Sequence, residues 1–157
     1  MRYHVIALVI ALTGIFGCTD PDPEAAFRAG DYETSFKQWL ERAEKGDVKA
    51  QNYVAIHYHM GLAVKQDHKA AVEWYQRAAR AGNADAQRNL GTMYQLGLGV
   101  GQDRLRAYAW YYAAAERGHP KARDYLKLMA NQLTPNQIAQ AKRLLAEELV
   151  DRKAGDS

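Results

Sequence analysis

Gly61-Leu-Ala-Val-Lys-Gln-Asp67 and Gly97-Leu-Gly-Val-Gly-Gln-Asp103 decide the fold, because these two stretches repeat at a spacing of 36 residues. The same period continues outward from them in both directions. It relates Trp74-Tyr75 to Trp110-Tyr111, and it relates three aspartates, three alanines and three glycines: Asp31, Asp67, Asp103; Ala43, Ala79, Ala115; Gly46, Gly82, Gly118. So many positions in one register indicate an internal repeat.

Each half of the repeat predicts a helix. The second half begins at Asp67 or Asp103, where a carboxylate can accept bonds from the free amides of a helix N-terminus. It ends at Gly82 or Gly118, where a left-handed residue can terminate the helix. A single helix-turn-helix unit cannot bury both of its faces, so the units are expected to stack. In the first half, apolar residues four apart share one helical face: Ala50, Val54, Tyr58 and Ala86, Leu90, Tyr94.

Both ends of the repeat region predict further helices. Pro23–Gly30 is typical of a short leading helix, and Thr134-Pro-Asn-Gln137 is a capping box with proline at the first helical position. We expect the helix after this box to close the open end of the stack. Its apolar stripe would be Ile138, Ala141, Leu145 and Leu149, and the side chains toward water would be Lys142, Arg143, Glu147 and Glu148.

The stretch Ala86-Gln-Arg-Asn-Leu-Gly-Thr-Met-Tyr-Gln-Leu-Gly-Leu-Gly-Val100, followed by Asp103, Ala107, Trp110, Ala115 and Gly118, resembles the Sel1-like repeat, which is related to the tetratricopeptide repeat. An earlier copy has Ala55 and Ala63 in place of Gly91 and Gly99. The resemblance implies an all-α, right-handed α/α solenoid with a C-terminal capping helix. Its segments would be 24–46 (N-terminal helix and half repeat), 47–82 and 83–118 (repeats), and 119–152 (C-terminal half repeat and capping helix).

The resemblance also implies that the first helices of the repeats line a concave surface that binds a protein or an extended peptide. Ile56 and Leu128 would be its apolar anchors, and the other positions are mostly polar. An ordinary solvated helix face is an equally open interpretation. The residues expected to line this groove are spaced three and four apart on the first helices, on the side away from the core. They are Lys49, Asn52, Ile56, His59, Asp85, Arg88, Thr92, Gln95, Lys121, Asp124, Leu128 and Asn131.

The first 17 residues are typical of a signal peptide, with a basic start and an apolar run too short to span a bilayer. Ile15-Phe16-Gly17-Cys18 resembles a lipobox, which makes Cys18 the expected lipid attachment site; cleavage by ordinary signal peptidase is the alternative. Residues 18–23 would form a tether. We therefore expect a bacterial periplasmic lipoprotein that contacts the membrane only through its lipid. Thr19 after Cys18 favours the outer membrane.

Several kinds of chemistry find no support in the sequence. A net charge of +3 is too balanced for nucleic acid to be the partner. His57 and His59 point to different sides of a helix and lack a partner at i+4, so no metal site is predicted. The two serines, Ser35 and Ser157, belong to no nucleophile motif, and Gly97–Gly101 lacks the ending of a phosphate-binding loop. No catalytic residue, metal or cofactor is predicted.

The expected function is therefore that of a non-catalytic adaptor or scaffold for protein–protein interaction at the periplasmic face of a membrane. The alternative is an envelope ligand-binding or hydrolytic protein, acting on β-lactams or the cell wall, because cysteine-rich relatives of the family have been linked to such activity. Those relatives carry paired cysteines in each repeat. This chain carries only Cys18.

Overall fold

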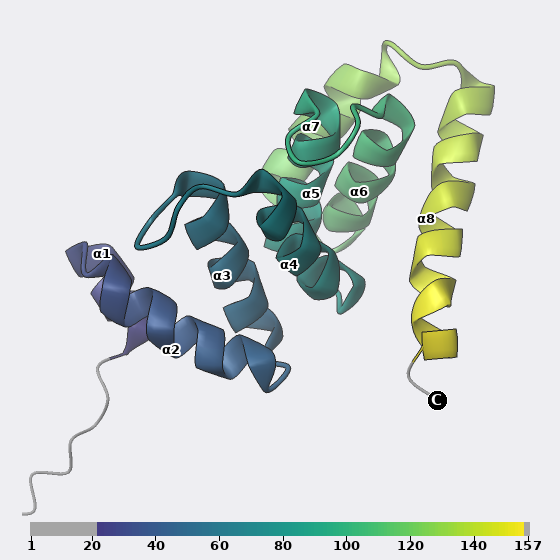
Figure 1. Cartoon of the computed structure of the whole chain (residues 1–157). Coiled ribbons are helices and arrows are strands. Elements are labelled where there is room, and N and C mark those ends of the chain that lie inside the picture. Colours follow the sequence, from purple (N-terminus) through teal and green to yellow (C-terminus); the bar gives the residue numbers. More distant parts are fainter. Residues whose placement is uncertain (1–21, 156–157) are drawn as a thin grey trace, which may run out of the picture.

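The computed structural model describes residues 22–155, and the side chains of residues 22–150. The predicted signal peptide, Cys18 and residues 19–21 of the predicted tether lie outside this range. Eight helices and no strand occur within it (Figure 1). They are α1 (Pro23–Ala29), α2 (Tyr32–Glu44), α3 (Val48–Met60), α4 (His68–Arg80), α5 (Ala84–Leu96), α6 (Arg104–Glu116), α7 (Pro120–Ala130) and α8 (Pro135–Gly155). None of these helices is both long and apolar enough to cross a bilayer.

The expected helix signals are confirmed at both ends of the repeat. The Asp67 carboxylate accepts from the amides of Lys69 and Ala70, and Asp103 does the same for α6. Gly82 and Gly118 follow α4 and α6 with φ of +93° and +83°. The capping box before α8 also forms, since Thr134 and Gln137 exchange backbone-to-side-chain bonds of 2.9 and 3.3 Å. Local sequence therefore sets where these helices begin and end.

The helices stack in chain order from α1 to α7, each against the next (Figure 1). The repeated aromatic positions fill the spaces between them, because a buried ring covers a large apolar area. Trp39, Tyr75, Trp110 and Tyr111 are all buried. This confirms the expectation of an all-α solenoid, and these four rings are part of its core.

The last helix, α8, runs beside the stack and packs mainly on α6, with a smaller contact to α4 (Figure 1). Ala141 and Leu145 are buried there, as the apolar stripe predicts. Covered by α5, α7 and α8, α6 is buried nearly all round. Glu148 differs from the expectation of full exposure: its carboxylate is half-buried and binds Arg106 Nε at 3.0 Å. This ion pair holds the Glu148 side chain against α6.

The loop of the second repeat crosses over the first repeat. Gly99 has a φ of +71°, and a Cβ there would lie 2.3 Å from the backbone oxygen of His68, at the start of α4. The equivalent Ala63 also has a positive φ, +61°, but it is exposed. Glycine is therefore required at position 99, where the backbones of two repeats approach closely, and not at position 63, where the alanine is exposed.

Candidate functional site

The odd-numbered helices share one hollowed face of the molecule. Two cavities open on it, one between α1, α3 and α5, and the other between α5, the start of α6, and α7. The even helices α4 and α6 instead contact α8. We call the surface formed by α1, α3, α5 and α7 the groove.

The first cavity has a volume of about 700 Å³ and collects five of the residues predicted to bind a partner. Three of them have partners within the protein: Lys49 pairs with Glu24 at 2.5 Å, Asn89 donates to Asn52 at 3.4 Å, and Asp85 lies 3.2 Å from His119 Nε2. The bond to Lys49 lowers the pKa of the Glu24 carboxyl. The lining is Glu24, Phe27, Lys49, Asn52, Tyr53, Ile56, Met60, Asn83, Asp85, Arg88 and Asn89.

The second cavity, of about 460 Å³, contains two of the predicted residues, Gln95 and Leu128. Gln95 is held in place, because its side-chain oxygen accepts from the Tyr111 hydroxyl at 2.7 Å and its carbonyl accepts from Gln102 at 2.8 Å. Tyr125 stacks on Tyr111 at 4.9 Å. The lining is Gln95, Leu96, Gln102, Arg104, Tyr125, Leu128, Met129 and Gln132.

Five predicted residues line neither cavity. Thr92 is half-buried, and its hydroxyl contacts that of Tyr111 at 3.0 Å. His59 packs against His68 with ring centroids 5.1 Å apart, and burial lowers its pKa. The remaining three lie exposed on or at the end of α7: Lys121, Asp124 and Asn131.

The structure also shows groove residues that the sequence did not reveal. Met60 and Leu96 are 58% and 60% exposed, and each occupies the same place in its repeat. Together with Tyr125 and Leu128, which is 62% exposed, they make the groove the site of most large exposed apolar side chains among residues 22–150. Their spacing could have indicated this, since Met60 is four residues beyond Ile56 on the same helix.

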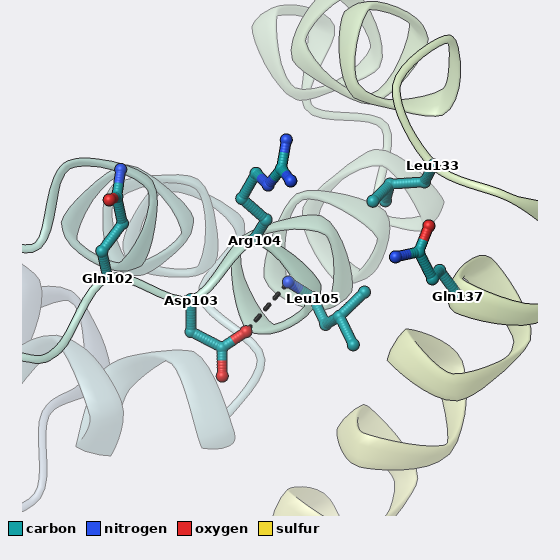
Figure 2. A pocket seen from close by; sticks show the side chains of 6 residues that line it. All are labelled: Gln102, Asp103, Arg104, Leu105, Leu133 and Gln137. Atoms are coloured by element: carbon teal, nitrogen blue, oxygen red, sulfur yellow. Dashed lines mark hydrogen bonds between the residues drawn. The ribbon is translucent and has the colours of Figure 1, made fainter.

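A third hollow, of about 650 Å³, lies between the start of α6 and the turn before α8, and is lined by Gln102, Asp103, Arg104, Leu105, Leu133 and Gln137 (Figure 2). Its one carboxylate is occupied as a helix cap. Asp103 accepts from the Leu105 amide at 2.9 Å, shown by the dashed line, and pairs with Arg106 at 3.1 Å. This hollow therefore offers no free acid for catalysis.

The one Ser–His contact in the described part of the chain is structural. His57 Nε2 lies 3.3 Å from Ser35 Oγ, and Nδ1 lies 2.9 Å from the Leu62 carbonyl oxygen. Both side chains are completely buried, so a substrate cannot reach them. Burial lowers the pKa of His57. Among residues 22–150, no group of three or more His, Cys, Asp or Glu side chains could hold a metal ion.

These features define the chain as an α/α solenoid repeat protein with a hollowed, partly apolar face. The Sel1 repeat model matches residues 48–83 and 84–119. The chain contains two Sel1 repeats. Proteins of this kind generally mediate protein–protein interaction. No curated protein matches the chain.

Two solved structures share the fold. One is a protective antigen with an SLR fold, present in uropathogenic Escherichia coli strains; it is 25% identical over 86% of this chain, with a TM-score of 0.74. The other is a Sel1 repeat protein from Oxalobacter formigenes, 29% identical over 80% of this chain, with a TM-score of 0.68. The chain spans about one third of the first protein (32%) and about half of the second (54%).

Proposed function

We propose that the chain is a non-catalytic adaptor that binds a partner protein, as an extended segment, in the groove. The observation that carries this proposal is the gathering of Met60, Leu96 and Leu128 on the face that also contains the two cavities. Covering each of these side chains would contribute about 1 to 2 kcal/mol. An exposed apolar patch of this kind marks an interaction surface.

Substitution of matched exposed residues tests this proposal. Leu128 in the groove and Val150 on α8 are 62% and 63% exposed, so aspartate at either position leaves the core intact. In cells that produce the protein naturally, crosslinking mass spectrometry should capture the same partner with wild type and with Val150→Asp. Leu128→Asp should lose it. Equal capture by both variants would place the binding surface elsewhere.

We further propose that the adaptor is exported and anchored to the periplasmic face of a bacterial membrane through a lipid on Cys18. The support is the leader followed by Ile15-Phe16-Gly17-Cys18. Metabolic labelling with an alkyne fatty acid should label the wild-type protein and leave Cys18→Ser unlabelled, with the variant moving from the membrane fraction to the soluble fraction. A labelled Cys18→Ser protein would contradict the anchor.

A further inference from the structure

The charges of the groove are unevenly compensated. Five charged residues line its two cavities: Glu24, Lys49, Asp85, Arg88 and Arg104. Lys49 and Glu24 neutralise each other, and Asp85 contacts Nε2 of His119 at 3.2 Å. Arg88 and Arg104 have no acidic partner within residues 22–150. His119 is charged only when it is protonated, so the two guanidinium groups and the Asp85 carboxylate all lack a permanently charged partner, and positive charge is in excess on the cavity walls.

Arg88 also lacks an acceptor for part of its hydrogen-bonding capacity. Its Nε is buried and donates to nothing in the described part of the chain. Its charge acts on His59, Tyr75 and Tyr111, and none of these side chains is a carboxylate. A buried donor without an acceptor is costly, and guanidinium groups bind carboxylates with particular geometric fit. The wall of the first cavity is thus prepared for an acidic group.

Arg104 stands in the second cavity beside exposed apolar side chains. It occupies the same repeat position as His68, just as Leu96 occupies that of Met60. In both repeats a glutamine bridges the loop: Gln66 donates to the His59 carbonyl and Gln102 to the Gln95 carbonyl, each at 2.8 Å. The repeat framework therefore sets the positions of Leu96 and Arg104, which share the second cavity.

The one acid on α7 is Asp124, which is exposed. It lies three residues from Lys121 on one side and from Lys127 on the other, so this stretch of α7 has a net positive charge. The helix that supplies Tyr125, Leu128 and Met129 to the second cavity therefore also carries an excess of positive charge. Complementary charge selects and orients a partner that also makes apolar contacts.

We propose that the groove binds a peptide segment in which aspartate or glutamate lies next to aliphatic residues. This inference rests on the proposed function. One carboxylate binds Arg88 at the first cavity. A second binds Arg104, with its neighbouring aliphatic side chain against Leu96 and Leu128 in the second cavity. Specificity for acidic partners comes from the two arginines, and the apolar contacts supply most of the affinity.

A random peptide library displayed on phage and selected against the purified full chain tests this inference. The enriched peptides should carry acidic residues beside Leu, Ile or Met. The best of them, made synthetically, should bind about five- to tenfold more weakly to Arg88→Gln and to Arg104→Gln, with a flatter salt dependence. Arg143→Gln, an exposed arginine on α8 that lines neither cavity, should bind like wild type.

Leu128→Ser separates failure of this inference from failure of the proposed function. The enriched peptides could lack acidic residues and bind both arginine variants as tightly as wild type, yet fail to bind Leu128→Ser. That result would overturn the acidic preference while leaving the groove as the binding site. Peptides indifferent to Leu128→Ser as well would contradict both. Failure to enrich any peptide would overturn the inference, because it requires a short segment to be sufficient for binding.

Discussion

At the scale of single residues, the repeat is defined by positions where only one kind of side chain fits. The aspartate caps and Trp110 belong to this group, and their roles follow from sequence spacing alone. Gly99 also belongs to it, but its reason appears only in three dimensions, since its neighbour is the His68 backbone of the preceding repeat. The sequence shows only that position 99 is glycine where the preceding copy has Ala63, and the packing shows what excludes a Cβ at position 99.

Gly99→Ala should destabilise the protein by about 2 kcal/mol, because it combines a left-handed backbone with a clash against backbone atoms that cannot rotate away. Gly101→Ala is the matched control in the same loop, since a Cβ there meets nothing within 4 Å. Urea denaturation monitored by circular dichroism measures both. An equal effect of the two substitutions would show that the contact between repeats at Gly99 does not constrain the loop.

His57 makes stability depend on pH. Its folded-state pKa is lowered by burial, so at acidic pH the unfolded chain binds a proton that the folded chain excludes. Stability should fall as the pH drops below the unfolded value of about 6.5 toward the folded value. Met93 and Met129 occupy the equivalent positions, so His57→Met combined with Ser35→Ala should fit the site.

The measurement for His57 is the free energy of unfolding at pH 7.5 and at pH 5.5. Wild type should lose more stability between these values than the double variant does. His59, whose pKa is also lowered, titrates in the same window and remains in both proteins, so the variant should keep part of the dependence. An unchanged difference would mean that His57 does not supply the pH dependence.

At the scale of elements, helix boundaries were predictable because caps and glycines are local signals. The position at which α8 packs on the other helices was less predictable. Its apolar stripe, which includes Ala141 and Leu145, was clear, but the stripe does not say which helix it covers. The ion pair from Glu148 to Arg106 joins residues 42 positions apart, and no local pattern reveals such a contact.

Leu145→Ala should destabilise the protein by about 2 kcal/mol, since the Leu145 side chain is buried at the contact of α8 with the core. Val150→Ala, on the exposed side of the same helix, should change stability by less than about 0.5 kcal/mol. Thermal unfolding of the two variants makes the comparison. If both are neutral, α8 contributes little to holding α6 in place.

At the scale of the whole molecule, stacking creates the groove by placing the first helices of the repeats side by side. Lys49, Ile56 and Arg88, which sequence spacing assigned to one face, line the same cavity. It did not separate engaged from free side chains, because Lys49 pairs with a residue of α1, 25 positions away. It also omitted Met60 and Leu96, whose exposure at the helix ends depends on how the loops fold.

The central claim is that partners bind on the face of the odd helices. Its most direct test is photo-crosslinking from single sites in living cells, with a benzophenone amino acid at Leu96 in the groove or at Arg143 on the outer side of α8. Adducts with a partner protein should form from position 96 and not from position 143. Adducts from position 143 alone would contradict the account.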